Sequence, residues 1–215
     1  MTAPPIPAAR PDVPSHRLLL TLGIAGAIAG LAIVFVFRGT QPTILRYKAE
    51  QLRLAVFQVL HEPERFDTLY VIDGALITQV PESPDAYEQV FVGYDGNRRV
   101  GFAITAGEPG FQDVIRLIFG YDPDRRAVLG MKVLESKETP GLGDKIEKDS
   151  SFVVQFDGAE TPLLGIKARD ATGDPHEIDM ITGATISSRT VIRAINEAMV
   201  RLGPMIDDYL GTDSQ

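Results

Sequence analysis

Two short stretches of this sequence combine residue types that could bind an organic ligand. The first is Thr182-Gly183-Ala184-Thr185, where glycine permits a sharp turn and Thr185 presents a hydroxyl at the expected start of a helix. A helix N-terminus carries unpaired N–H groups and a partial positive charge, so it favours a phosphate. The threonine hydroxyl could donate a hydrogen bond to that phosphate or become its ester oxygen. The alternative interpretation is a threonine-rich helix cap without a ligand.

The second stretch is residues 138–143, with the sequence ETPGLG, at the end of an expected strand. Its proline fixes one backbone angle, and its two glycines permit the close approach of a ligand. Its polar side chains, Glu138 and Thr139, are candidates for ligand contacts. Composition alone favours a plain turn before a helix that begins near Asp144.

Taken together, these stretches resemble a known family. Residues Asp179 to Thr185 resemble the flavinylation motif of the FMN-binding domain shared by the G subunit of the Rnf/Rsx electron-transport complex and the C subunit of the sodium-pumping NADH:quinone reductase. Residues 138–143 also resemble the family and lie at the expected distance upstream. The Gly110-Phe111 step is similar to the family as well; Phe111 could stack on a flavin ring or belong to the core. The resemblance covers most of the chain.

The resemblance implies a role for each of these residues. It implies that Thr185 carries FMN through a phosphoester bond, as an attachment residue and not as a catalytic one. Asp179 is expected to be read by the transferase that attaches FMN or to order the loop, and not to bind a permanent metal ion. Thr182 stands where serine is also common in the family, which is a mild departure. The expected cofactor-binding residues are Thr185, Thr182, Gly183, Ala184, Glu138, Thr139, Gly141, Leu142 and Gly143.

The resemblance also implies a function. Rnf-type complexes move electrons between ferredoxin and NAD and couple this transfer to ion movement, so this chain would be one electron relay and not a complete enzyme. Its expected partners are the other membrane and iron–sulfur subunits, a flavin transferase that uses FAD with Mg²⁺, and membrane lipid. The chain is shorter than typical C subunits of the quinone reductase, which favours the Rnf-type G subunit. The alternatives are the quinone-reductase C subunit, another anchored extracytoplasmic flavoprotein, or an anchored binding module without redox function.

The composition of the chain restricts the chemistry further. Its 215 residues include no cysteine, so disulfides, cysteine-ligated iron–sulfur clusters and cysteine-based zinc sites are excluded. The three histidines, His16, His61 and His176, are scattered, which does not favour a metal site. The net charge of −8, without a basic patch, argues against nucleic-acid binding. Any redox chemistry in this chain therefore needs an organic cofactor.

An apolar segment near the N-terminus is expected to anchor the chain in a membrane. Leu18–Phe37 contains twenty residues without a charge, which makes roughly 30 Å of helix, enough to cross a bilayer. We expect a disordered tail over residues 1–16 and a transmembrane helix over residues 17–38. A cleaved signal peptide is the alternative, but the segment is long for one, and residues 38–42 lack an A-x-A cleavage site.

Basic residues lie on both sides of this segment, so the positive-inside rule does not decide its orientation. The resemblance implies a single-pass protein of the bacterial cytoplasmic membrane, with a cytoplasmic N-terminus and the large domain on the periplasmic or outer side. Residues 39–66 are expected to form a helical connector, because apolar residues recur at helical spacing between Thr43 and Leu60. Its basic face is expected to be solvated; contact with lipid headgroups is the alternative.

The rest of the chain predicts one α+β FMN-binding domain over residues 67–211, with antiparallel hairpins and flanking helices, and a polar tail over residues 212–215. Hairpin turns are indicated by the DGN sequence at residues 95–97 and the DPD sequence at residues 122–124. The last long helix is expected to end at Gly203-Pro204, before a short second helix. The expected strands are Thr68–Ile72, Ala75–Val80, Gln89–Tyr94, Val100–Ala106, Val114–Tyr121, Ala127–Glu135, Ser151–Phe156 and Leu163–Ala168.

Overall fold

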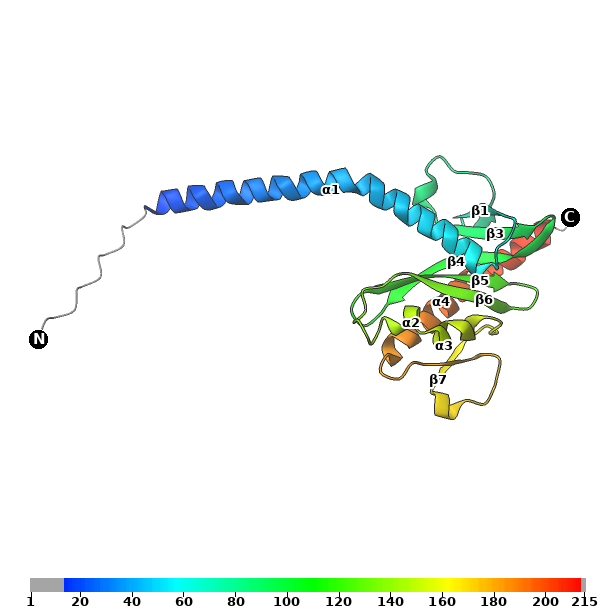
Figure 1. Cartoon of the computed structure of the whole chain (residues 1–215). Coiled ribbons are helices and arrows are strands. Elements are labelled where there is room, and N and C mark those ends of the chain that lie inside the picture. Colours follow the sequence, from blue (N-terminus) through cyan, green and yellow to red (C-terminus); the bar gives the residue numbers. More distant parts are fainter. Residues whose placement is uncertain (1–13, 214–215) are drawn as a thin grey trace, which may run out of the picture. The chain divides into compact units, whose positions relative to one another are not determined.

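The computed structural model describes residues 14–213 and has the α+β architecture that the sequence predicts: an N-terminal apolar helix, an antiparallel sheet and flanking helices (Figure 1). Most of the expected N-terminal tail, residues 1–13, lies outside the described residues, as do residues 214–215 of the expected C-terminal tail. The chain divides into two compact units, Met1–Ala49 and Glu50–Gln215.

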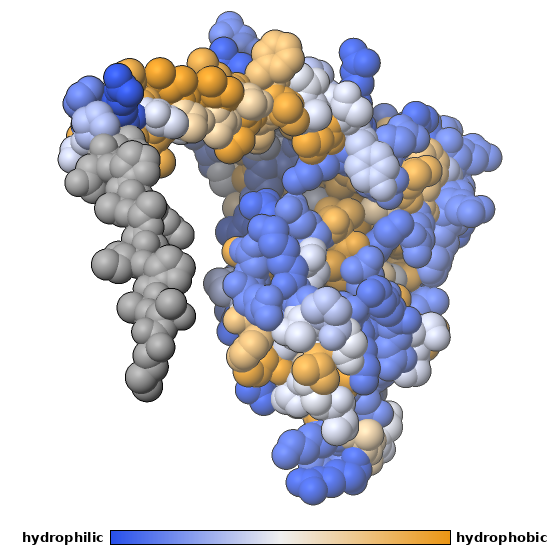
Figure 2. All heavy atoms as spheres, turned by 60° about the vertical axis from the view of Figure 1, so that its left-hand side comes forward, coloured by the Kyte–Doolittle hydropathy of each residue, from blue (hydrophilic) through white to orange (hydrophobic). Residues whose placement is uncertain are grey.

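Helix α1, Ser15–Val59, contains 45 residues and runs without a break through the expected transmembrane segment and into the expected connector. The apolar side chains of its first part, residues 18–37, are exposed; Leu31 is 72% exposed and Phe35 is 82% exposed. Figure 2 shows this apolar surface in orange along the helix. The helix is long and apolar enough to cross a membrane, where lipid would cover these side chains.

A six-stranded antiparallel sheet forms the centre of the second unit, with the strand order β2-β1-β3-β4-β5-β6. The hairpins predicted at residues 95–97 and 122–124 are confirmed as β3–β4 and β5–β6. The Asp73-Gly74 pair, in which both residues have positive φ, makes the β1–β2 turn. The strands are β1 Arg65–Ile72, β2 Ala75–Ile77, β3 Gln89–Asp95, β4 Arg98–Pro109, β5 Val114–Asp122 and β6 Ala127–Glu135.

Side chains alternate between the two faces of this sheet, and both faces are buried. Phe91, Ala103 and Ile118 point to one face, where they pack against residues 55–60 at the end of α1. The second compact unit therefore begins at Glu50 and includes part of the expected connector, whereas the sequence predicts the start of the domain at residue 67.

Three glycines lie on this face, and two of them, Gly93 and Gly120, let the end of α1 approach the sheet closely. Gly93, Gly101 and Gly120, which we call the glycine platform, lie on β3, β4 and β5. A Cβ atom placed on Gly120 would lie 2.0 Å from the carbonyl oxygen of Val59, and one on Gly93 would lie 2.8 Å from Cδ1 of Leu60. A side chain at residue 120 would push the helix away from the sheet, because it would meet a backbone atom of α1. At residue 93 it would meet the side chain of Leu60, and at residue 101 it would meet the Tyr121 carbonyl oxygen within the sheet.

Helix α4, Thr185–Asp213, covers the opposite face of the sheet (Figure 1). Its buried residues Val191, Ile195 and Leu202 pack in the cluster that contains Phe102 and Phe119. Two short strands, β7 and β8, pair in parallel before α4. The remaining elements are α2 Lys145–Lys148, α3 Ser150–Val153, β7 Leu164–Ile166, β8 Glu177–Asp179, and the 3₁₀ turns Pro84–Ala86, Val154–Phe156 and Ala168–Asp170.

The strand predicted at Ser151–Phe156 is wrong, because this segment forms α3 and a 3₁₀ turn. The side chain of Asp149 caps α3 by accepting a hydrogen bond from the Ser151 N–H, at 3.0 Å. Phe152 and Phe156 are four residues apart and both point into the core, which is a helical spacing and not the alternation of a strand.

The predicted helix end at Gly203-Pro204 is also wrong, because α4 continues to Asp213. Leu202 and Ile206 lie on either side of this step and are fully buried, so packing holds the helix together despite the proline. The carbonyl that loses its partner belongs to Val200, which is 76% exposed, so water can replace the missing N–H.

Candidate functional site

The motif at residues 179–185 forms a tight turn between β8 and α4. The Ala184 N–H donates to the Ile181 carbonyl at 3.0 Å, which closes a four-residue turn. Gly183 occupies the third position of this turn with a φ of +85°, a conformation that L side chains adopt at a cost. The glycine of the motif is therefore required by the backbone and leaves Thr185 as the first residue of the helix.

Ser188, which the sequence interpretation missed, fixes this turn to the first turn of α4. Its hydroxyl donates to the Ala184 carbonyl at 3.0 Å and accepts from the Ile181 N–H at 3.2 Å. The residue is fully buried. A serine one helical turn after the motif was the available signal, because such a side chain can reach back to the preceding loop.

The Thr185 hydroxyl is available for a bond to a ligand. Within residues 14–213, no hydrogen-bond partner is present for the side chain of Thr185 or of Thr182. The Ala184 carbonyl accepts the Ser188 N–H at 2.9 Å, so Ala184 is the N-cap of α4. Alanine has no side-chain oxygen to cap the helix, so an external anion could take this role.

Glu138 does not lie on the open surface of the site; it is only 6% exposed. Its Oε1 accepts hydrogen bonds from the N–H groups of Phe111 at 2.9 Å and Gln112 at 3.0 Å, and its Oε2 accepts one from the Ser187 hydroxyl at 2.6 Å. Burial raises the pKa of the Glu138 carboxyl, but the hydrogen bonds from Ser187, Gln112 and Phe111 outweigh burial and hold this pKa below its ordinary value.

The structure brings the two sequence-predicted stretches together. Cδ2 of Leu142 lies 3.9 Å from the position of a Cβ atom on Gly183. Gly143 is buried beside Glu138 and Ser187, whereas Gly141 is exposed. Thr139 points to the preceding loop, where its hydroxyl oxygen accepts from Nε2 of Gln112 at 2.8 Å.

The side chain of Asp179 is half-buried. The backbone of Asp179 is hydrogen-bonded to a side chain outside the motif, that of Gln155. The Asp179 N–H donates to Oε1 of Gln155 at 2.7 Å, and the Asp179 carbonyl accepts from Nε2 of Gln155 at 3.4 Å. This side-chain amide completes the free edge of β8, which pairs with β7 on its other edge. Gln155 was missed because it lies 24 residues upstream in a segment that was predicted as a strand.

Apolar side chains are exposed around Thr185. Leu142 is 51% exposed, Ile186 is 52% exposed and Phe111 is 65% exposed. The alternative that Phe111 belongs to the core is therefore wrong, while its stacking on a flavin stays a prediction. Exposed apolar side chains beside a free hydroxyl and a helix N-terminus fit a ligand that has a phosphate and a flat apolar ring system, as FMN does.

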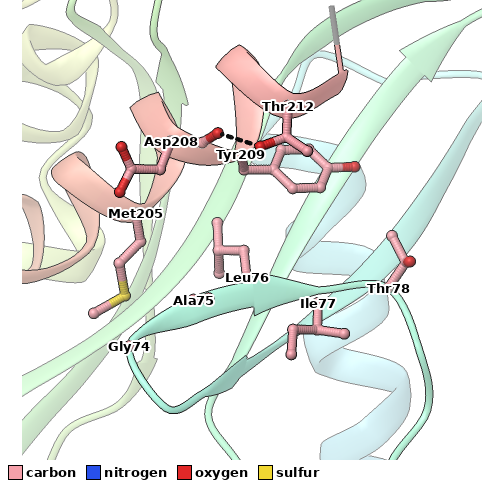
Figure 3. Close-up of a pocket in the computed structure, with 9 residues that line it drawn as sticks. All are labelled: Gly74, Ala75, Leu76, Ile77, Thr78, Met205, Asp208, Tyr209 and Thr212. Carbon is pink, nitrogen blue, oxygen red and sulfur yellow. Dashed lines mark hydrogen bonds between the residues drawn. The ribbon is translucent and has the colours of Figure 1, made fainter. Parts of the chain in front are cut away.

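The molecule also has a cleft that is separate from this site. A cleft of about 370 Å³ lies between β2 and the last turns of α4, and its lining includes Leu76, Met205 and Tyr209 (Figure 3). The cleft begins twenty residues after Thr185 along α4, which is roughly 30 Å of helix. The residues of the motif do not take part in it.

Comparisons with known proteins agree with these features. A family model described as the FMN-binding domain matches residues 110–200. The G subunit of the ion-translocating oxidoreductase complex of Yersinia pestis is 32% identical over 189 residues, which cover 87% of this chain and 88% of that protein. The corresponding protein of Salmonella typhimurium is 32% identical over 185 residues, covering 85% and 87%. Among solved structures, NqrC of Shewanella oneidensis has a similar fold, with a TM-score of 0.56, 17% identity, and coverage of 70% of this chain and 91% of that chain.

Proposed function

Because this chain belongs to the family of G subunits of ion-translocating oxidoreductase complexes, we propose that it is a membrane-anchored flavoprotein that relays electrons through FMN bound to Thr185 by a phosphoester. The observation that carries this proposal is the Thr185 hydroxyl, which has no partner within the described residues and begins a helix whose N-cap, Ala184, offers no capping oxygen. The phosphate of FMN would complete the first turn of α4.

The residues around Thr185 would hold and orient the cofactor. The turn at Gly183 presents the ester oxygen, and the exposed side chains of Leu142, Ile186 and Phe111 would contact the ring system and exclude water from part of it. FMN, when bound, supplies a centre that accepts electrons one at a time and passes on one or two. A covalent bond keeps the flavin on the outer side of the membrane, where free flavin would dilute away.

We propose that a separate flavin transferase attaches FMN with FAD as the donor and Mg²⁺. The Thr185 oxygen would displace AMP from FAD, so that the phosphoester forms as the pyrophosphate bond breaks and the hydroxyl proton is released. In the part of the chain that the structure describes, no side chain is hydrogen-bonded to the Thr185 hydroxyl, so no local base is in place to activate it. Asp179 is the residue that the transferase would read, because its fold contacts are made by its backbone and its carboxylate has no hydrogen bond within residues 14–213.

Replacing Asp179 with alanine is expected to lower flavin loading by about tenfold, the effect of losing one charged hydrogen bond. The melting temperature should stay close to that of the wild type, because Gln155 bonds to the backbone of residue 179 and not to its side chain. Loading is measured as flavin fluorescence per mole of protein after denaturation. Full loading of the Asp179→Ala variant would contradict this role.

The anchor and the partners follow from the same proposal. Helix α1 would cross the bacterial cytoplasmic membrane once, with the N-terminus in the cytoplasm and the FMN domain on the periplasmic or outer side. The other subunits of an Rnf-type complex would supply and accept the electrons, and lipid would surround α1. A role as the C subunit of a sodium-translocating NADH:quinone reductase is the second candidate, supported by the fold of NqrC.

The proposed function is tested by isolating the full chain in detergent after expression with an active flavin transferase. The expected result is a fluorescent band that survives denaturation and a mass increase that matches one esterified FMN. Reductive titration should then bleach the flavin absorption in a reversible manner. A dark band and an unmodified mass would leave the fold as described and rule out the covalent flavin.

A further inference from the structure

The carboxylate of Glu138 joins three segments that are far apart in the sequence. Its Oε1 accepts from the backbone of Phe111 and Gln112, which follow β4. Its Oε2 accepts from Ser187, in the first turn of α4, 49 residues downstream. Glu138 itself begins the 138–143 loop. One side chain thus fixes two loops and one helix end in a single arrangement.

The fold makes room for this carboxylate with two glycines. A Cβ atom on Gly110 would lie 2.5 Å from Oε1 of Glu138, and a Cβ atom on Gly143 would lie 2.7 Å from its Oε2. Within residues 14–213, no salt bridge connects Glu138 to a cation. The buried charge is therefore stabilised by hydrogen-bond donors and by the positive end of α4 alone.

The same helix turn carries the attachment residue. Ser187 is two residues after Thr185, so the hydrogen bond from its hydroxyl fixes the turn that presents the Thr185 hydroxyl. Other contacts of α4 reinforce this arrangement: Thr190 and Arg193 donate to the Pro109 carbonyl at 3.1 and 3.0 Å. Both oxygens of Glu138 accept hydrogen bonds from the protein itself, so the carboxylate has a structural task in the absence of a ligand.

We propose that Glu138 is a positioning residue, which holds the first turn of α4 and the loops at residues 110–112 and 138–143 in the arrangement that FMN attachment to Thr185 requires. This inference rests on the proposed function, and it assigns Glu138 a role that differs from the direct flavin contact implied by the sequence. Glutamine should replace it well, because its carbonyl oxygen can accept both N–H groups and its amide can donate to Ser187.

The first test does not depend on flavin. Amide hydrogen exchange is measured on the full chain in detergent with Thr185→Ala in the background, so that no flavin is attached. The Phe111 and Gln112 amides donate directly to Glu138 and are expected to exchange about tenfold faster in Glu138→Ala and to stay within about threefold of the control in Glu138→Gln. Glu147→Gln, which removes an exposed charge on the nearby helix α2, is the matched control.

The second test measures flavin attachment with purified transferase, FAD and Mg²⁺, on the chain with Thr185 intact. Attachment is expected to slow by about tenfold or more in Glu138→Ala and in Glu138→Asp, whose carboxylate is one methylene too short, and to recover in Glu138→Gln. Rescue by glutamine separates positioning from a requirement for charge. Unfolding of the Glu138→Ala variant would also slow flavin attachment. It would be recognised because amide exchange would then be fast throughout the domain and not only at residues 111–112.

Acidification supplies the third readout. The hydrogen bonds to Glu138 lower its pKa in the folded state. The ionised carboxylate therefore contributes to the stability of the folded domain above the unfolded-state pKa, and this contribution is lost as the pH falls through the folded-state pKa. The protection factors of the Phe111 and Gln112 amides, which are corrected for the intrinsic pH dependence of exchange, should therefore fall in acid in the wild type, but by no more than about threefold, because a protonated carboxyl keeps the same donor and acceptor as the glutamine amide. This pH dependence should be absent from Glu138→Gln. Nearby ionised pairs, Asp113 with Lys137 and Asp144 with Lys148, titrate equally in both proteins and cancel in the comparison.

Three results would overturn the proposal. Normal exchange and normal attachment in Glu138→Ala would show that the contacts of Glu138 do not position Thr185. Slow attachment and an altered flavin spectrum with unchanged exchange at residues 111–112 would assign Glu138 to the flavin itself. A wild-type chain that accepts no flavin refutes the proposed function and, with it, the role of Glu138 in attachment, even where the exchange test shows that Glu138 organises the loops.

Discussion

Replacing Thr185 with alanine is expected to abolish covalent flavin, so that the denatured protein gives no fluorescent band and has the mass of the bare chain. The reason is chemical: without the hydroxyl, no oxygen at residue 185 can form the phosphoester. The Thr185→Ser variant keeps the oxygen at the start of α4 and is expected to retain the flavin. The fold should survive all of these changes, because Thr185 is half-buried and its hydroxyl has no partner within residues 14–213.

Thr182→Ala is the matched control for this experiment. Thr182 has the same functional group, lies three residues before Thr185 and is exposed, but it is the second residue of the turn and does not begin the helix. Its alanine variant is expected to retain a fluorescent band, with slower attachment if the transferase reads the whole motif. A fluorescent Thr185→Ala protein would move the attachment site away from Thr185, and a fluorescent Thr185→Ala protein beside a dark Thr182→Ala protein would move it to Thr182.

Replacing Gly120 with alanine is expected to destabilise the domain by about 3 kcal/mol, the upper part of the range for overpacking a close contact. Its Cβ atom would lie 2.0 Å from the Val59 carbonyl oxygen, so the backbone of α1 must move away from the sheet. That movement would loosen the packing of Val59 and Leu60 against Phe91 and Ile118. No side-chain rotation can relieve the clash, because a backbone atom causes it.

Gly107 provides the matched glycine for this comparison. It also lies in a strand, β4, but the nearest atoms to its added Cβ are 3.6 Å away, which is ordinary contact. Gly107→Ala is expected to change the free energy of unfolding by less than about 1 kcal/mol. The chain has no tryptophan, so denaturant unfolding in detergent is followed by circular dichroism. Equal stabilities of the two variants would contradict the close approach of α1 to the glycine platform.

The sequence predicted those features that depend on neighbouring residues. The turns at residues 95–97 and 122–124 were recognisable because aspartate, glycine and proline favour turn geometry locally. The motif before α4 was recognisable for the same reason, since Gly183 supplies the positive φ of the turn. In each case the information lies within a few residues.

Features that depend on distant residues could not be predicted in this way. The continuation of α4 past Pro204 depends on the burial of Leu202 and Ile206 against the sheet. The contacts of Glu138 depend on Phe111 and Ser187, which only the tertiary fold brings together. The sequence around Glu138, with Gly141 and Gly143 after it, does not distinguish a carboxylate that faces a ligand from one that faces the protein interior.

The helix that is long and apolar enough to cross a membrane also belongs to the domain, because residues 55–60 at its end pack against the sheet. This limits how the domain can be excised. A fragment that begins at residue 67 would lack residues 55–60 and would present Phe91, Ala103 and Ile118 to water. Such a fragment is expected to aggregate. A fragment that begins at Glu50 would instead keep this face of the sheet covered by residues 55–60, and it is expected to aggregate less than the shorter fragment.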